Sequence, residues 1–229
     1  MFAVMFELTP VPERLTEYSA TLRAMRSQVQ QIPGFISTER FASRAPAGKF
    51  LVISFWKDER AIATYRANHL HHTTQIKARS EMLRDYRLTV GRVISEGAEV
   101  VPAEKFGDPA PRRYLALGAG PAGRFIRPPT TLLGSGTRHS AAASGSGSTG
   151  AGGVGSPAEV VPWVWYDSMY EPGKTMATVE TTFEQAAGVL SELRLGGARE
   201  MRVIAVSRDY GMFDRDDAPQ YHAPISPKG

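Results

Sequence analysis

Three of the five histidines in this chain lie within four positions, at His69, His71 and His72. An imidazole with an ordinary pKa of ~6.5 can take a proton from a phenol, or it can ligate haem iron through its free nitrogen. His69 and His72, three positions apart, could also begin a metal site. No Asp, Glu or His at helical spacing supplies a third ligand, so we expect no metal site. The structural alternative is a half-buried helix end with solvated histidines.

Four further side chains are candidates for a binding site. Trp56 ends a predicted strand, where an indole can line a pocket and stack on a flat ligand, or can simply fill the core. Tyr65, Arg79 and Tyr86 have polar tips and are candidates to point into a pocket. Arg79 could hold an anionic group of a substrate or could be solvated at a helix end.

Composition excludes several classes of protein. The chain has 229 residues, no cysteine and a net charge of +4, so disulfides, thiolate nucleophiles and Cys-ligated metals are excluded. The cations are scattered singly, which argues against a nucleic-acid partner. The longest uncharged stretch, residues 139–158, is rich in Gly, Ser and Ala and cannot span a bilayer. The apolar N-terminus lacks a basic region before it, so we expect a cytoplasmic protein.

Residues 1–98 are expected to fold as a β-α-β-β-α-β unit. Predicted strands cover residues 2–8, 35–43, 49–56 and 86–93. The first helix should bury one stripe of side chains spaced three and four apart: Leu15, Tyr18, Leu22, Met25, Val29 and Ile32. In the second helix an unbroken α-helical spacing places Ala61, Tyr65, His69, His72 and Ile76 on one face.

The rest of the chain echoes this unit. A Gly-Lys pair heads a strand at residues 174–181, a helix follows at 182–193, and another strand at 200–207. With strands at 113–117 and 160–166, residues 112–209 would form a second, degenerate unit whose first helix is displaced. Residues 134–157 hold eight Gly, six Ser and four Ala and read as a dispensable flexible linker. We therefore divide the chain into a domain at 1–98, a connecting segment at 99–133 with one possible strand, the linker at 134–157, and the second half with its tail at 158–229.

The segment around the histidines resembles the antibiotic biosynthesis monooxygenase (ABM) domain family. The resemblance lies in Phe55, Trp56, Ala61 and Ile62, followed by Tyr65, His71, Gln75, Arg79 and the run at residues 85–90. It implies ferredoxin-like α+β units that pair their sheets into an α+β barrel, here as an intrachain pseudo-dimer or as a homodimer through the first unit. The aligned family histidine is His71, whereas an unbroken helix would turn His72 inward. A helix break near Asn68 would reconcile the two.

The resemblance implies an activity and one alternative to it. The first hypothesis is a cofactor-independent monooxygenase acting on a small flat aromatic or quinol-like molecule, with His71, Trp56 and Tyr65 as catalytic candidates and His69, His72, Arg79 and Tyr86 as binding candidates. The alternative is a non-catalytic barrel protein that binds a small ligand or haem. Family asparagines are missing: Val52 stands where quinol oxygenases carry one, and residues 2–8, where haem-degrading members carry one, contain none.

Two further expectations concern the second half. Residues 118–123 match G-x-G-x-x-G, but no helix starts at these glycines, so a dinucleotide site is not expected. The position equivalent to Trp56 is Thr181, and the second half's helix has no histidine. The active site should therefore lie in the first unit, with Asp209, Tyr210 and Arg215 packing near it or capping the chain.

Overall fold

The computed structural model describes residues 1–96, 99–122 and 163–219. The first half contains β1 (Phe2–Pro10), α1 (Leu15–Val29), β2 (Phe35–Ser43), β3 (Phe50–Trp56), α2 (Glu59–Ala67), α3 (His69–Lys77) and β4 (Leu83–Val93). The second half contains β7 (Arg113–Pro121), β8 (Val164–Ser168), β9 (Lys174–Thr181), α4 (Phe183–Leu195) and β10 (Glu200–Gly211). Between them lie the short strands β5 (Ser95–Glu96) and β6 (Glu99–Val100) and a 3-10 helix, Ala103–Phe106.

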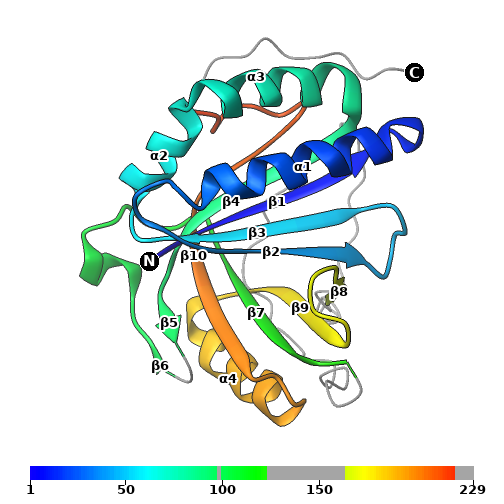
Figure 1. Cartoon of the computed structure of the whole chain (residues 1–229). Helices are drawn as coiled ribbons and strands as arrows, with labels where there is room; N and C mark the ends of the chain where they lie inside the picture. Colours follow the sequence, from blue (N-terminus) through cyan, green and yellow to red (C-terminus); the bar gives the residue numbers. More distant parts are fainter. Residues whose placement is uncertain (97–98, 123–162, 220–229) are drawn as a thin grey trace, which may run out of the picture.

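Eight antiparallel strands close into one barrel in the order β1-β3-β2-β8-β9-β7-β10-β4 (Figure 1). The first half contributes β4-β1-β3-β2, and the second contributes β10-β7-β9-β8, which is the same ferredoxin-like order repeated. The halves join at two seams, β2 with β8 and β4 with β10. The predicted α+β barrel with an intrachain tandem repeat is confirmed, and the barrel closes within one chain.

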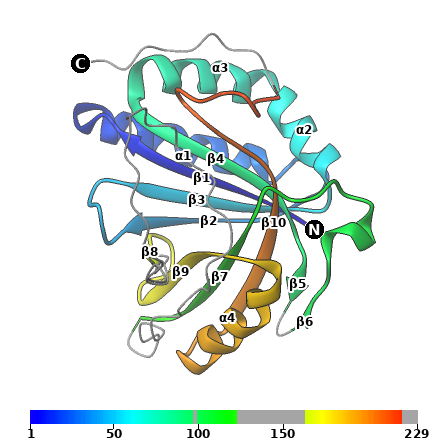
Figure 2. The same ribbon diagram turned by 180° about the vertical axis from the view of Figure 1, so that it is seen from behind.

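The barrel has an apolar interior and an apolar outer layer beneath the helices. Alternate residues of each strand face inward, because side chains alternate along a strand. Fourteen buried residues form the interior cluster, Met5, Ile53, Leu117 and Tyr166 among them. The opposite faces of the strands pack beneath α1, α2 and α3 in the first half and beneath α4 in the second (Figures 1 and 2).

The first helix departs from its predicted stripe at both ends: it begins at an exposed Leu15, and it ends at Val29, so Ile32 lies beyond it. Tyr18, Met25 and Val29 are buried as expected, but Leu15 is 40% exposed because it is the first residue of α1, beyond the sheet contacts. The predicted linker at 134–157, the displaced helix and the start of the predicted strand at 160–166 lie outside the described residues.

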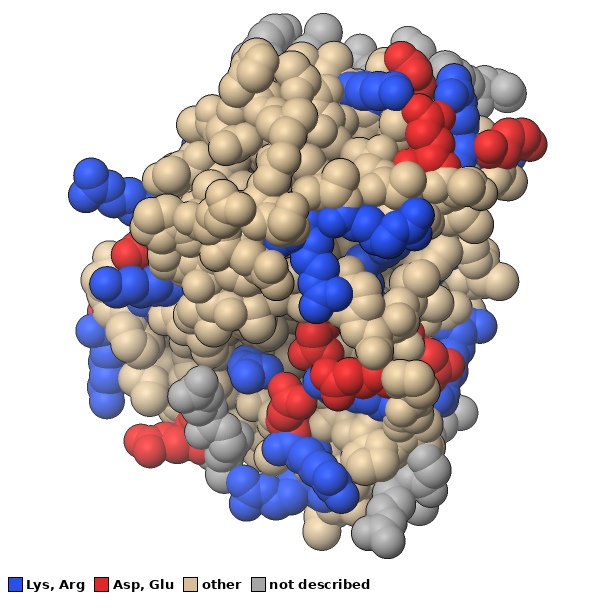
Figure 3. Space-filling view, in the orientation of Figure 1, with Lys and Arg blue, Asp and Glu red and all other residues tan. Residues whose placement is uncertain are grey.

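Gly118 and Gly120 of the glycine motif lie in strand β7. An added Cβ at Gly118 would lie 2.7 Å from Leu193 Cδ2, and one at Gly120 would lie 2.7 Å from the carbonyl oxygen of Gly197. These glycines let β7 pass close beneath α4 and the turn after it. Basic and acidic side chains are interspersed on the face shown in Figure 3. No helix among the described residues is long and apolar enough to cross a membrane.

Candidate functional site

A helix break at Asn68 decides which histidine faces the sheet. Asn68 has φ −62° and ψ 127°, which is extended backbone between α2 and α3. Its side-chain oxygen accepts hydrogen bonds from the backbone N–H groups of Leu70 and His71 at 3.1 and 3.2 Å, so it caps α3. The break resets the helical phase and turns His71 inward.

Three rings stack over the helical face of the first sheet. The Trp56 and Tyr65 rings are 5.3 Å apart between centroids at 30°, and those of Tyr65 and His71 are 3.9 Å apart at 24°. Trp56 is 1% exposed, and its indole N–H donates to Ser54 Oγ at 2.9 Å. Phe35 packs edge-on against Trp56 at 5.3 Å. The structure thus brings together the three residues that the sequence nominated as catalytic.

Burial changes the acid–base properties of this stack. Desolvation lowers the pKa of His71 to about 4, against smaller opposing effects of the Tyr65 and Arg66 carbonyls. Burial also raises the pKa of Tyr65 to about 12. At pH 7 both groups are neutral, so His71 can accept a proton or a hydrogen bond. Its buried Nδ1 atom makes no hydrogen bond of good geometry with a described residue, although the Tyr65 and Arg66 carbonyl groups lie close enough to the imidazole to act on its pKa.

The other two histidines take different positions. His69 is exposed at the start of α3, and His72 is half-buried. The expectation that His69, His72 and Ile76 share one buried helix face is wrong for His69 and Ile76: His69 is exposed and Ile76 is 50% exposed, whereas His72 is half-buried. The physical reason is the Asn68 break, which an unbroken helical wheel does not contain.

Arg79 and Tyr86 form a second group at the other end of the same sheet face. Arg79 lies in the single π-helical turn Ala78–Met82 after α3, and Tyr86 lies on β4 beside Phe6, with ring centroids 5.7 Å apart. Arg215 Nη1 from the C-terminal half donates to Tyr86 Oη at 2.7 Å. The expected approach of Arg215 to the first unit is therefore present in the structure.

Comparisons with known proteins identify the family. Residues 1–77 match the family model described as antibiotic biosynthesis monooxygenase. A Pyricularia oryzae protein named jasmonate monooxygenase ABM is 30% identical over 233 residues, covering 99% of this chain and 100% of that protein. The chain belongs to the antibiotic biosynthesis monooxygenase family.

Two solved structures are also similar to part of this chain. A crystal structure described as an antibiotic biosynthesis monooxygenase is 20% identical and covers 44% of this chain and 100% of its own, with a TM-score of 0.35. Rv0793 from Mycobacterium tuberculosis is also 20% identical, covering 44% of this chain and 97% of its own, with a TM-score of 0.36.

The second half of this ABM protein lacks the ring stack. Thr181 ends β9 where Trp56 ends β3, and it is 6% exposed. The following helix, α4, buries Ala186, Val189 and Leu190 and has no histidine. The candidate chemistry is therefore asymmetric between the two halves of the ABM barrel.

A metal centre and a surface groove are two other kinds of site to compare with the ring stack. Within residues 1–96, 99–122 and 163–219, no group of three His, Asp or Glu side chains could hold a metal ion. One groove among the described residues contains none of the nominated site residues. Its lining includes Phe2, Glu59, Arg92, Asp108, Pro109 and Ser207. In this groove Arg92 is held by Asp108 and lies over the rings of Phe2 and Phe106 at 4.5 and 4.8 Å, so its charge is already matched.

Sequence reasoning missed two supports of the stack, Ser54 and Phe35. Ser54 lies two residues before Trp56 on the same strand face, so the period-two spacing could have nominated it. Phe35 pairs with Trp56 across the β2–β3 ladder, and no local sequence signal specifies that register.

Proposed function

We propose that this ABM protein is a cofactor-independent monooxygenase of a small, flat aromatic or quinol-like substrate. The observation that carries the proposal is the inward-facing His71, stacked on Tyr65, with a buried Nδ1 that makes no hydrogen bond of good geometry with a described residue. Buried polar atoms are nearly always paired, so an unpaired one at a ring stack suits a substrate hydroxyl.

In the proposed reaction His71 accepts the hydroxyl proton of a phenolic substrate. The resulting phenolate is electron-rich and can give electrons directly to dioxygen. In a quinol, one oxygen atom enters a ring C–H bond as a hydroxyl group and the other leaves as water, while the quinol loses its two hydroxyl hydrogens and becomes a quinone. The substrate itself therefore supplies the two electrons, and no outside reductant is needed. The low pKa of His71 makes it a weak base, which restricts the substrate to acidic phenols.

The relative that matches this chain over nearly its whole length suggests a second candidate substrate. Because the Pyricularia oryzae protein is named a jasmonate monooxygenase, jasmonate is a candidate substrate for this chain as well. Insertion of oxygen into a C–H bond to give an alcohol and water consumes two electrons beyond those of the substrate. Turnover of jasmonate would therefore depend on an added reductant, whereas turnover of a quinol would not.

The test is oxygen uptake by the purified full-length protein with a quinol panel and with jasmonate, each with and without NADPH as reductant. Products formed under ¹⁸O₂ are weighed by mass spectrometry. We expect quinol turnover without reductant and one labelled oxygen atom per product. His71→Gln should lower turnover, while His69→Gln, an exposed change on the same helix, should not. No uptake with any substrate, together with a Soret shift on haem titration, would favour the non-catalytic haem-binding alternative.

A further inference from the structure

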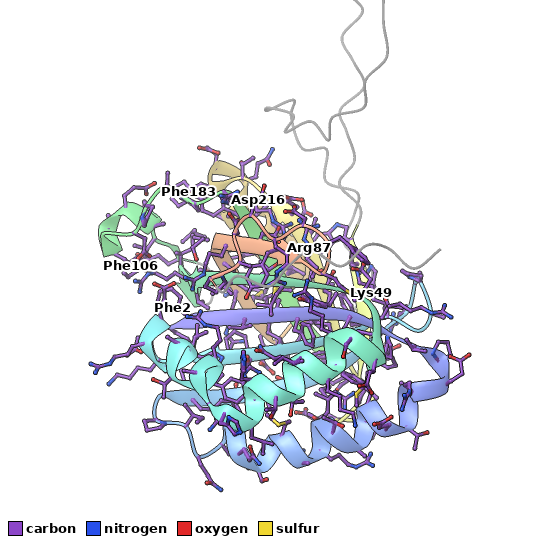
Figure 4. The ribbon with its side chains drawn as sticks, turned by 90° about the horizontal axis from the view of Figure 1, so that it is seen from above. Phe2, Lys49, Arg87, Phe106, Phe183 and Asp216 are labelled. Carbon is purple, nitrogen blue, oxygen red and sulfur yellow. The ribbon has the colours of Figure 1, made fainter. Side chains whose placement is uncertain are left out.

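The C-terminal tail, residues 212–219, docks on the first half of the chain. It follows β10, which pairs with β4 at one seam of the barrel. The Met212 backbone N–H donates to the Tyr86 carbonyl oxygen at 3.0 Å, and Met212 is 5% exposed. Further along, the tail is held by residues outside the first half: Asp217 accepts from the Asp209 backbone N–H at 3.1 Å and pairs with Arg112 at 2.5 Å. Figure 4 labels the tail residue Asp216 near Arg87 of β4, which pairs with Gly211 at the end of β10.

This docking brings Arg215 of the second half to Tyr86 and brings the tail backbone to Arg79 of the first half. Arg215 donates to Tyr86 Oη at 2.7 Å and to the Gly211 carbonyl oxygen at 3.4 Å. Arg79 donates to the Met212 carbonyl oxygen at 3.3 Å, next along the same tail. The Arg215 guanidinium also lies 5.7 Å from the centre of the Tyr210 ring.

The charges at this position are mutually unfavourable. Burial, together with the positive charge of Arg215, lowers the pKa of Arg79, which Tyr86 partly opposes. Arg66, Arg208 and Arg215 all act to lower the pKa of Tyr210 against the effect of burial. Planar guanidinium groups match the two oxygens of a carboxylate, so two of them on adjacent positions can bind one carboxylate group.

The cationic position and the ring stack share one sheet face. On β4, Tyr86 and Leu88 point to the same side because they are two residues apart. Leu88 packs in the cluster that contains Trp56 and Tyr65, and Tyr210 is its partner across the β4–β10 ladder. Leu88 therefore lies between the Trp56–Tyr65–His71 ring stack and the position of Arg79 and Arg215 on this sheet face.

We propose that Arg215, supplied by the second half of the chain, acts with Arg79 to bind a carboxylate of the substrate. The inference deepens the proposed function and rests on it: the substrate has a ring that reaches the Tyr65–His71 stack and a carboxylate at its other end. Arg215 is a binding residue that sets specificity, and the second half of the barrel contributes directly to the site.

Calorimetric binding without dioxygen tests this inference apart from turnover. The probes are two acids, jasmonate and 3-hydroxy-2-naphthoate, and their uncharged methyl esters, on the full-length protein. We expect at least one acid to bind more tightly than its ester. Arg215→Met, which keeps the aliphatic stem, should weaken binding of that acid by about tenfold or more and change binding of the ester less than twofold. Arg215→Lys should restore part of the loss.

Arg194→Met is the matched control because it removes the same charge from an exposed position on α4. It should leave both affinities unchanged. Wild-type protein that binds neither acid, or binds acid and ester equally, overturns the inference, as does an equal loss for acid and ester in Arg215→Met. Should Arg215→Met fail to fold, the wild-type salt dependence decides: acid affinity must fall as NaCl rises while ester affinity stays constant. Acid binding that depends on Arg215 without any oxygen uptake would reject the proposed function alone.

Discussion

The imidazole of His71 lies 3.9 Å from the ring of Tyr65, centroid to centroid, with 24° between their planes. This contact exists because Asn68 has extended backbone between α2 and α3, and its side chain caps the N-terminus of α3. A stacked, desolvated imidazole has its orientation fixed by packing, which is what a proton acceptor in a binding site needs. It also makes His71 part of the packed layer, so its removal affects both chemistry and stability.

Replacement of His71 by Gln should separate those two effects. Gln retains similar volume and a hydrogen-bonding tip but cannot take a proton. We expect kcat with a quinol substrate to fall by about 10²-fold, typical for loss of a general base, and Tm to fall by only a few degrees. His69→Gln, on the exposed side of the same helix, is the control and should match wild type in both measurements. Wild-type turnover in His71→Gln would show that the imidazole is a packing residue only.

Stability should depend on pH through His71. Its folded-state pKa of about 4 lies below the ordinary value of 6.5, so the unfolded chain binds the proton more readily. The contribution of neutral His71 is therefore fully present above pH 6.5 and is lost as pH falls from 6.5 to 4. The loss amounts to about 3 kcal/mol at pH 4.

Urea denaturation at several pH values measures this dependence. The difference in unfolding free energy between pH 7 and pH 4 should shrink in His71→Gln relative to wild type. The exposed His69→Gln variant corrects for the general effect of acid on the carboxylates. An unchanged difference in His71→Gln would contradict the assigned low pKa.

The strand and helix patterns of the sequence predict most of this fold. The repeated Gly-Lys-strand-helix-strand order predicts the pseudo-dimer. Each half shows the same succession of strand-like and helix-like spacing of its apolar residues. The ring stack was only partly predictable: Trp56, Tyr65 and His71 each stand out by type. Their contact depends on the Asn68 break, which a helical wheel cannot include. The role of the tail was open, because the pairing of β10 with β4 is a long-range contact that no local pattern encodes.

Gly91 is expected to be indispensable at the β4–β10 seam. A Cβ added there would lie 2.3 Å from the Ala205 carbonyl oxygen and 2.6 Å from Ile204 Cγ2, so the backbone of β10 would have to move. We expect Gly91→Ala to lower the unfolding free energy by about 3 kcal/mol. Gly188→Ala in α4 is the matched control, since an added Cβ meets nothing within 4 Å there. That change should stabilise the protein by about 0.5–1 kcal/mol, because Ala favours a helix interior over Gly. Equal behaviour of the two variants in urea denaturation would contradict the tight seam.

The two halves should depend on each other for folding. In the intact chain β2 pairs with β8 and β4 pairs with β10, so residues 1–98 alone would have two unpaired sheet edges. They would also expose the barrel-facing side chains of Met5, Ile53 and Phe55, which are buried in the full chain. We expect the fragment to be insoluble or an obligate dimer that closes a barrel with its own copy. Size-exclusion chromatography with light scattering gives its mass, and co-expression with residues 99–229 should return a soluble one-to-one complex. A soluble, folded monomer of residues 1–98 would contradict this dependence, because the inner face of its sheet would then be stable in water without the second half to cover it.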